Sequence, residues 1–514
     1  MTLKNLLLSS IGAFVCNAAI SQNTVTLDFV HAKDTINKNI YGHFAEHLGR
    51  CIYDGVYSGN VRNIPNKNGI RLDIAEALKK LKVPVLRWPG GCFADTYHWK
   101  DAIGQKEKRK QISNTSWGNV REDNSFGTHE FLDFCELIGA EPYLATNMGG
   151  GTVQEAVDWV QYANHANGSS YLTDMRLQNG RKTPWNVKYW GIGNESWDCG
   201  GAMTVDYYVN EYKKYATMMT SYSNTEGLFR IAVGPGTEDY NWTETLMKEI
   251  PARRIEGVSL HHYSVINWNK KSSATNFTED EYIQTMYQAW RMDSFLIKNK
   301  AVMDKYDPKK RVALIVDEWG GWYEVEPGTN SAFLYQQNTM RDAMIAGLTL
   351  NLFNNHCDRV RMANLAQMVN VLQAVILTKQ EKMILTPTYH VMEMYNVHQD
   401  ALMIPVKVAS KEYVLGERKI KAISASASKD KSGAVHISLV NMDAHKEQEI
   451  NIDMGNITAG SVSGRILQSA SLQTHNTFES PDNITPAVFY KALLNGSNLT
   501  VKMPPFSVVV LTLK

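Results

Sequence analysis

The sequence contains few cysteines, and none of them are paired by a short spacing. Its 514 residues include six cysteines. The five that follow residue 21 are Cys51, Cys92, Cys135, Cys199 and Cys357. An odd number without a C-x-x-C spacing indicates neither a disulfide framework nor a zinc site. We therefore expect these cysteines to be mostly small buried side chains.

The sequence also lacks an excess of charge of either sign and a long apolar run beyond its first residues. Lys and Arg number 53 against 52 Asp and Glu, a formal net charge of +1. This balance argues against a nucleic-acid or acidic-membrane partner, and no later stretch reaches the ~20 apolar residues of a membrane span. A neutral polymer is the more suitable partner for a chain of this charge. The 24 Tyr and 12 Trp can stack on sugar rings, although aromatic residues are also common in protein cores.

The N-terminal segment has the pattern of an export signal. Apolar residues 6–20 lead to Ala19-Ile20-Ser21, a small-x-small cleavage pattern. This predicts a secretory signal peptide over residues 1–21 and a periplasmic or extracellular protein. A buried N-terminal helix is the alternative. Cys16 allows a lipoprotein anchor, but Val15 before it is bulkier than the small residue such sites carry.

From residue 39 to 384, strand patterns alternate with helix patterns. Residues 69–81 have helical spacing, and residues 83–88 form an apolar run that Pro89-Gly90-Gly91 closes. Later helices are predicted at 128–138, 153–167, 205–222, 242–249, 279–299 and 331–350. Eight such units favour an α/β fold, a (β/α)8 TIM barrel over residues 39–384. The alternative, an open doubly wound sheet, lacks a G-x-G-x-x-G motif after its first strand.

From residue 385 to 514 the pattern changes to short segments that alternate apolar and polar residues. Asn and Gly separate these segments, which is typical of an antiparallel β-sandwich of the jelly-roll kind. An early strand at 24–30, within the segment 22–38, is expected to join this sandwich. No acidic strand end is found in residues 385–514, so we assign them a structural role.

Two strand patterns within the barrel region end on glutamate. The run Lys-Tyr-Trp-Gly-Ile-Gly-Asn-Glu reaches Glu195, and an apolar run from 312 to 316 reaches Asp317 and Glu318. A buried carboxylate is costly and indicates chemistry or an ion pair. In an α/β barrel the active site lies at the carboxyl ends of the strands, and glycosidic hydrolysis needs two carboxylates across the bond. The sequence therefore predicts a glycosidase, but not the separation that distinguishes retention from inversion.

Six ordered motifs give a closer comparison. They are IYGHFAEHLGRCIY at 40–53, RWPGGCF at 87–93, GIGNE at 191–195, SLHHY at 259–263, DEW at 317–319 and ANLAQMVNV at 363–371. Together they resemble the α-L-arabinofuranosidases of glycoside hydrolase family 51, in the retaining clan of barrel glycosidases. The resemblance covers nearly the whole chain after residue 21.

The resemblance implies an exo-acting retaining hydrolase. It would remove terminal α-L-arabinofuranosyl residues from arabinose-containing plant polysaccharides or oligosaccharides, as in arabinan degradation. Glu195 is implied as the acid/base and Glu318 as the nucleophile of a double displacement. No cofactor or metal is implied, and family members are often homo-hexamers.

The resemblance also implies residues that bind the sugar. Glu46, Tyr263 and Gln367 are expected to contact the terminal arabinose, since carboxylate and amide groups suit adjacent hydroxyls. The alternative for Glu46 is a salt bridge with Arg50 or Arg87.

Three further residues of the expected site each have two readings. Asn194 can reach the sugar 2-hydroxyl or instead bind strand-end backbone. Trp322 can form a wall of the sugar pocket or part of the core. Cys92 stands where many family members carry Asn, which puts a side-chain contact there in doubt. Of His261 and His262, adjacent on a strand, one is expected near the site and one packed, with no metal.

Other functions remain open from the sequence. An endo-acting glucanase or a xylan-active glycosidase can use the same scaffold and two acids. A non-catalytic carbohydrate-binding protein is a third reading, which the presence of both glutamates opposes.

Overall fold

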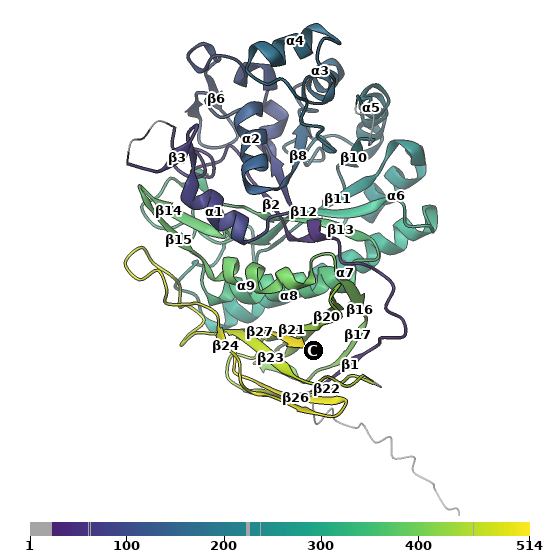
Figure 1. Cartoon of the computed structure of the whole chain (residues 1–514), viewed down its shortest axis with the longest axis vertical. Coiled ribbons are helices and arrows are strands. Elements are labelled where there is room, and N and C mark those ends of the chain that lie inside the picture. The colour runs from purple at the N-terminus through teal and green to yellow at the C-terminus, as the bar shows by residue number, and fades with distance from the viewer. Residues whose placement is uncertain (1–22, 60, 62, 223–226, 237, 456) are drawn as a thin grey trace, which may run out of the picture.

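The computed structural model describes residues 23–514 except 60, 62, 223–226, 237 and 456. The predicted signal peptide at 1–21 lies outside these residues. Two parts are visible in Figure 1, a barrel ringed by helices and a set of sheets that holds the C-terminus, with helices α8 and α9 between them. The predicted divisions at residues 38/39 and 384/385 stay predictions.

Eight parallel strands close into a barrel, as the sequence predicts. In their order around the barrel they are β2 (Gly42–Phe44), β5 (Val85–Trp88), β8 (Glu141–Thr146), β9 (Tyr189–Ile192), β10 (Phe229–Ala232), β11 (Gly257–Ser264), β12 (Ala313–Gly321) and β13 (Val360–Ala366). The pair of β13 with β2, in which Asn364 faces Gly42, completes the ring. Since all strands run the same way, their carboxyl ends meet at one mouth.

Helices follow the strands on the outside. They are α1 (Leu72–Lys80), α2 (Thr128–Ile138), α3 (Val153–Asn164), α4 (Tyr171–Gln178), α5 (Val205–Met218), α6 (Tyr240–Glu249), α7 (Glu279–Tyr306), α8 (Met340–Asn355) and α9 (Pro387–Tyr395). Threonine side chains cap several of them: the Oγ1 of Thr152, Thr204 and Thr278 accepts a backbone N–H of the first turn. Helices α4 and α9 were not predicted.

The predicted start of α8 at residue 331 is wrong. Residues Ser331–Phe333 form only a 3₁₀ turn, and the helix begins at Met340. Thr339 fixes this start, because its Oγ1 accepts the N–H of Arg341 while Asp342 accepts the backbone N–H of Thr339. A reciprocal cap of this kind outweighs a helical pattern that extends further back along the chain.

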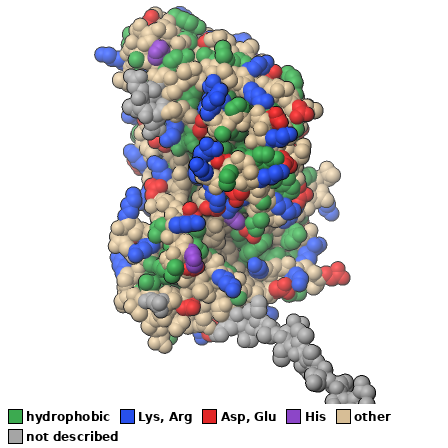
Figure 2. All heavy atoms as spheres, turned by 90° about the vertical axis from the view of Figure 1, so that its right-hand side faces the viewer, with side chains coloured by type: hydrophobic (Ala, Val, Ile, Leu, Met, Phe, Trp, Pro, Cys, Tyr) green, Lys and Arg blue, Asp and Glu red, His purple; other side chains and the backbone are tan. Residues whose placement is uncertain are grey.

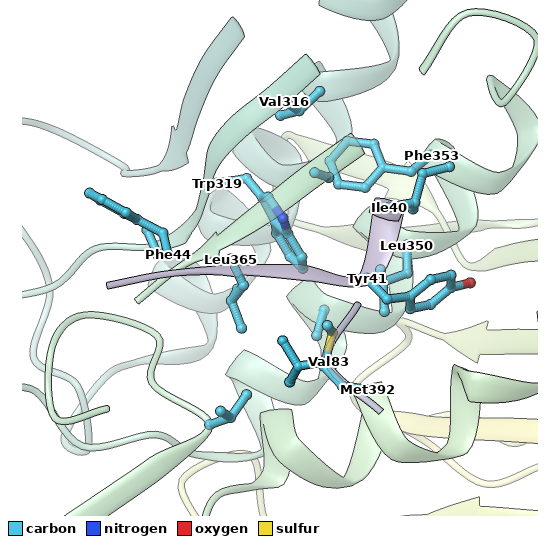
Figure 3. Close-up of a cluster of buried hydrophobic side chains, with 14 of the residues drawn as sticks. Ile40, Tyr41, Phe44, Val83, Val316, Trp319, Leu350, Phe353, Leu365 and Met392 are labelled. Carbon is cyan, nitrogen blue, oxygen red and sulfur yellow. The ribbon is translucent and has the colours of Figure 1, made fainter. Parts of the chain in front are cut away.

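Apolar side chains fill the barrel and the layer outside it. Inside lie Val85, Tyr143, Ile231, Ala313, Ile315 and Met362. Outside, Trp319 of β12 meets Phe353 of α8 edge to face at 5.5 Å, in the cluster of Figure 3 that also holds Leu365 and Met392. Burying large side chains on both faces of the strands stabilises the ring on which the mouth is built.

The C-terminal part consists of two sheets. One has the order β17 (Val406–Ala409), β1 (Asn23–Leu27), β22 (Gln448–Asp453), β26 (Asn498–Met503), β25 (Ala492–Asn495). The other has the order β16 (Leu402–Ile404), β20 (Ile423–Lys429), β21 (Val435–Asn441), β27 (Ser507–Leu513), β23 (Val462–Leu467), β24 (Ala487–Val488). Neighbours run antiparallel except β1 and β22, which pair in parallel, so the first strand of the described chain lies within a C-terminal sheet.

Four short hairpins complete the fold. They are β3 (Asn66–Lys67) with β4 (Ile70–Arg71), β6 (Ile112–Asn114) with β7 (Val120–Glu122), β14 (Ile376–Lys379) with β15 (Lys382–Leu385), and β18 (Glu412–Leu415) with β19 (Arg418–Lys421).

Helix α8 joins the two parts. Every residue from Met340 to Asn354 is buried, because the barrel covers one side of the helix and β20, β21 and β27 cover the other. At this interface Asn351 donates to Ser424 and Asn354 donates to Ser426. The sheets therefore support the barrel from the side of α8.

Among the helices of the described residues, none has the length and apolar character to cross a membrane.

Candidate active site

The two predicted glutamates lie in one cavity at the barrel mouth. The cavity has a volume of about 970 Å³, and Glu195 and Glu318 both line it. Glu195 follows β9 after a sharp turn in which Gly193 has φ +88° and Glu195 itself has φ +37°. This is a strained backbone for a residue with a side chain, and such strain clusters at functional sites.

The two carboxylates face each other at short range. One oxygen of Glu195, one of Glu318 and a ring nitrogen of His261 all lie within 4.8 Å of one another. His261 stands between them, with its Nδ1 at 2.9 Å from Glu195 Oε1 and 3.5 Å from Glu318 Oε2. The strand-end positions predicted that these two carboxylates would meet, and closure of the barrel determines the distance between them.

Glu318 is held from two sides. Arg87 Nη1 donates to its Oε1 at 2.7 Å, and the hydroxyl of Tyr263 donates to its Oε2 at 2.7 Å. Arg87 is fully buried and also faces Asp317, at 3.6 Å. The guanidinium and the hydroxyl therefore hold one oxygen each of the Glu318 carboxylate by hydrogen bonds.

Glu195 has a different environment. Burial raises the pKa of its carboxyl, and the negative charge of Glu318 raises it further, while the hydrogen bond and charge of His261 oppose this. The protonated form of Glu195 is therefore favoured more than the protonated form of an exposed glutamate. Two neighbouring carboxylates with different surroundings can therefore divide the roles of acid and base.

The carboxylates around His261 favour its protonated form. Burial alone lowers its pKa, but the charges of Glu318 and Asp317, together with its hydrogen bonds, outweigh burial and raise the pKa to about 10. Its Nε2 lies 3.1 Å from Asp317 Oδ1. The neighbouring His262 packs instead on Phe295 and on the carbonyl of Gln288, and burial lowers its pKa to about 4.

Replacing His261 by Gln is expected to shift the pH profile of the enzyme. The positive charge of His261 lowers the pKa of Glu195, so its removal raises that pKa and moves the alkaline limb of kcat/KM to higher pH. We also expect kcat to fall about 10- to 100-fold, because the carboxylates lose a positioning contact. The measurement is kcat/KM against pH, with His262→Gln as the control that leaves the limb in place. An unchanged limb, or one at lower pH, would contradict the assigned charge.

The part of the cavity wall around Glu46 is polar and buried. Glu46, 2% exposed, accepts hydrogen bonds from the N–H of Phe93, from Trp117 Nε1 and from Gln367 Nε2. Burial, and then the charge of Glu318, raises its pKa to about 7. A Cβ on Gly91 would lie 3.0 Å from Glu46, so the Pro-Gly-Gly turn makes room for the carboxyl.

The expected sugar-binding residues are only partly brought together. Those that line the cavity are Glu46, Cys92, Tyr263, Trp322 and Gln367. Asn194 does not line it: its Oδ1 accepts from Arg87 at 2.6 Å. Neither proposed salt bridge of Glu46 is formed, because Arg87 pairs with Glu318 and Asp317, and Arg50 donates to the carbonyl of Thr378.

The expectation that the cysteines form no disulfide is wrong for two of them. Cys92 and Cys199 are bonded, with their Cα atoms 5.5 Å apart and a sequence separation of 107 residues. Cys51, Cys135 and Cys357 are free and buried. Counting cysteines failed because this pairing depends on the meeting of two barrel loops, which no short spacing reveals. The bond ties the turn after β5 to the segment after Glu195, whose Oε2 lies 3.6 Å from the Cys199 sulfur.

Two clusters have the spacing of metal ligands, but neither fits an ion. They are Cys92, Glu195 and Cys199, and Glu195, His261 and Glu318. Disulfide sulfurs are not thiolate ligands. In the second cluster both ring nitrogens of His261 already lie within hydrogen-bond distance of a carboxylate oxygen, Nδ1 of Glu195 and Nε2 of Asp317.

Sequence reasoning missed several residues of the site. Asp95 is buried and accepts the N–H groups of Met148, Gly149 and Asn194, so it links the turns after β8 and β9. Burial raises its pKa to about 7. Trp117, from the β6–β7 hairpin, reaches Glu46. Neither ends a strand pattern, so the rule that found Glu195 and Glu318 does not detect them.

Comparison with known proteins gives matches along the chain. The family described as Alpha-L-arabinofuranosidase 1 domain matches residues 77–285, and the Alpha-L-arabinofuranosidase C-terminal domain matches residues 317–507. The chain is 48% identical over 506 residues to an intracellular exo-α-L-arabinofuranosidase of Bacteroides ovatus, an alignment that covers 98% of each chain. It is 31% identical to a probable α-L-arabinofuranosidase C of Aspergillus niger, over 85% of this chain and 88% of the relative.

Solved structures agree. A family 51 arabinofuranosidase of Xanthomonas axonopodis pv. citri superposes with a TM-score of 0.94 at 44% identity, covering 96% of this chain and 100% of the other. An α-L-arabinofuranosidase of Thermotoga maritima, described as an arabinose complex, gives 0.83 at 31% identity, covering 96% and 99%. A Paenibacillus polymyxa xyloglucanase of family 44, at 13% identity and a TM-score of 0.60, shares the fold alone.

One of these matches overturns the predicted export. The relative that aligns over 98% of both chains is named an intracellular enzyme, so the prediction of a secreted or periplasmic protein is wrong. That prediction depended on the composition of residues 1–21, where a short apolar run with small residues can occur without an export function.

Proposed function

This chain belongs to the α-L-arabinofuranosidases of glycoside hydrolase family 51, and from this premise we propose how it acts and on what. The enzyme removes terminal α-L-arabinofuranosyl residues from arabinose-containing plant oligosaccharides or polysaccharides, with retention of configuration. Glu195 is the acid/base and Glu318 the nucleophile. The observation that carries the proposal is the pair of carboxylate oxygens within 4.8 Å.

The short gap supports retention. Retaining glycosidases place their carboxyl groups about 5–5.5 Å apart, whereas inverting enzymes need about 6.5–9.5 Å to admit a water. In the first step Glu318 attacks the anomeric carbon while Glu195 gives its proton to the leaving oxygen. In the second step Glu195 takes a proton from water while the water oxygen attacks the anomeric carbon, which breaks the bond to Glu318 and releases the sugar.

The electrostatics of the pair support this change of role. The negative charge of Glu318 contributes to the raised pKa of Glu195. When Glu318 becomes an ester its charge disappears, so the pKa of Glu195 falls and the group becomes a base. Arg87 and Tyr263 hold Glu318 in place for the attack.

The inner end of the cavity receives the terminal sugar. Glu46 and Gln367 are 2% and 1% exposed and bonded to each other at 2.8 Å. Both residues line the cavity, and carboxylate and amide groups suit adjacent sugar hydroxyls. A buried wall at Glu46 and Gln367 favours an exo-acting enzyme, because a sugar chain cannot continue through it. Asn194 acts through Arg87 in this proposal.

A substrate panel tests the function. We expect 4-nitrophenyl α-L-arabinofuranoside to be hydrolysed with a kcat/KM far above that of the β-D-xyloside and β-D-glucoside, and NMR to detect the α-anomer first. Activity confined to a β-glucan or xylan polymer would instead support the endo-acting alternative. The homo-hexamer stays a prediction. Light scattering of the purified protein measures its oligomeric state.

A further inference from the structure

Asp95 is a buried carboxylate that takes no part in the two chemical steps. It belongs to the 3₁₀ turn Cys92–Thr96, which follows β5. Acidic side chains are spread over the molecular surface in Figure 2, where water solvates their charge, but Asp95 is only 4% exposed. Burial raises the pKa of its carboxyl to about 7. A carboxylate in such a place is destabilising by itself, which indicates that its contacts serve a purpose.

The side chain of Asp95 holds three backbone N–H groups from two turns at the barrel mouth. Its Oδ1 accepts from Met148 at 2.8 Å and from Gly149 at 2.7 Å, in the turn after β8. Its Oδ2 accepts from Asn194 at 3.1 Å, in the turn after β9. Two carboxylate oxygens have enough lone pairs to serve three donors at once. Asp95 therefore fixes the turn after β9 relative to the turn after β8.

The amide of Asn194 lies directly before the proposed acid/base. Gly193 has φ +88° and Glu195 has φ +37°, so the chain is in the left-handed region on both sides of Asn194. A residue with a side chain stays in that region only where its surroundings hold it there. A Cβ on Gly200 would lie 2.9 Å from Asp95 Oδ2, so packing leaves the carboxylate little room to move. The contact between Asp95 and Asn194 thus supports the backbone of Glu195.

The same loop is attached to the chain on the other side of Glu195. Cys199 is bonded to Cys92, which lies in the turn that carries Asp95. The two attachments, at Asn194 and at Cys199, flank Glu195 in the sequence. The loop after β5 therefore holds both ends of the segment from which the carboxyl of Glu195 projects.

We propose that Asp95 is a positioning residue for the acid/base. Through the N–H of Asn194 it keeps Glu195 in the backbone conformation from which the carboxyl gives its proton to the leaving oxygen. This inference rests on the proposed function, in which Glu195 is the acid/base. Asp95 is not among the residues that line the cavity, so its effect on the rate is indirect.

Asp95→Asn isolates the contact with Asn194. An amide side chain has one acceptor oxygen and one NH2 group, which only donates. The orientation that loses fewest hydrogen bonds keeps the oxygen on Met148 and Gly149, and it then places the NH2 against the N–H of Asn194. Two donors that face each other release the turn before Glu195, while the size of the side chain is unchanged.

The test compares two leaving groups. We expect Asp95→Asn to lower kcat/KM on α-1,5-arabinotriose about 10- to 100-fold, the scale of a misplacement by about 1 Å. On 4-nitrophenyl α-L-arabinofuranoside the loss is at least about fivefold smaller, because nitrophenolate leaves without a proton. A smaller folded fraction would lower both rates by the same factor. The ratio of the two losses therefore separates positioning from stability, and thermal unfolding verifies the fold.

Asp443→Asn is the matched control. Asp443 lies between β21 and β22, in the C-terminal part of the molecule, and it is 3% exposed. Its Oδ1 accepts the N–H groups of His445 and Lys446, and its Oδ2 accepts from the amide of Gln448. The same substitution there also places one donor against another. We expect Asp443→Asn to lower stability and to leave both rates of the folded enzyme unchanged.

The other outcomes are distinct. If Asp95→Asn does not fold, Asp95→Ser replaces it, because a serine places no NH2 group against Asn194, and the same selective loss is expected. An equal loss on both substrates, or wild-type rates in a folded variant, would overturn the role of Asp95. If the wild-type enzyme hydrolyses no arabinofuranoside, the proposed function fails instead. If Glu195→Ala loses both substrates equally, the acid/base assignment fails.

Discussion

Replacing Glu318 by Gln is expected to lower kcat on 4-nitrophenyl α-L-arabinofuranoside on the order of 10⁵-fold, the scale of loss when a nucleophile is removed. Gln keeps the shape of the side chain but cannot form the covalent bond to the anomeric carbon. Arg87 retains Asp317 as a charged partner at 3.6 Å, so the variant is expected to fold. Steady-state kinetics measure the loss, and thermal unfolding verifies the fold.

A matched variant separates loss of chemistry from loss of charge. Glu417 is exposed on the hairpin β18–β19, away from the mouth, and Glu417→Gln is expected to keep wild-type rates. If a folded Glu318→Gln enzyme retained activity within tenfold of wild type, Glu318 would not be the nucleophile.

The expected effect of Glu195→Ala depends on the leaving group. On arabino-oligosaccharides kcat/KM falls about 10³- to 10⁴-fold, the upper part of the range for general acid catalysis. The first step on the 4-nitrophenyl glycoside is less affected, because nitrophenolate leaves without a proton. Release of the sugar from Glu318 then becomes slow, since no base activates water. A burst of nitrophenol followed by slow turnover is the expected time course.

Added azide provides a second measurement on the same variant. Truncation at Glu195 opens space next to the anomeric carbon, and azide can attack the intermediate without a base. We expect azide to raise turnover of Glu195→Ala and to form an arabinofuranosyl azide, but to leave the wild-type rate unchanged. Equal loss on both substrates without azide rescue would contradict the acid/base role.

Some features of the site follow from local sequence. The alternation of strand and helix patterns identifies the barrel, because each strand and helix buries a face of fixed period. Glu195 and Glu318 are identified because each ends an apolar run. A carboxylate buried there is costly unless chemistry or an ion pair requires it. The motif resemblance extends this to the family, which the comparisons support over nearly the whole chain.

Other local patterns misled. The helical pattern predicted a helix from residue 331, but the cap at Thr339 makes α8 begin later. The composition of the first 21 residues indicated export, against the intracellular relative. Periodicity does not reveal the capping hydrogen bonds at Thr339. Composition does not reveal whether an export system recognises the first 21 residues.

The sequence by itself determined the architecture and the two acids, since these depend on the order of buried and polar residues along short segments. Only the tertiary structure decided the 4.8 Å limit on the carboxylate pair, the place of His261 between them, the pairing of Arg87 with Glu318 and the Cys92–Cys199 bond. Each of these joins residues from different strands or loops that meet only when the barrel closes. Distances across a closed ring depend on the packing of all eight strands, and no local pattern encodes them.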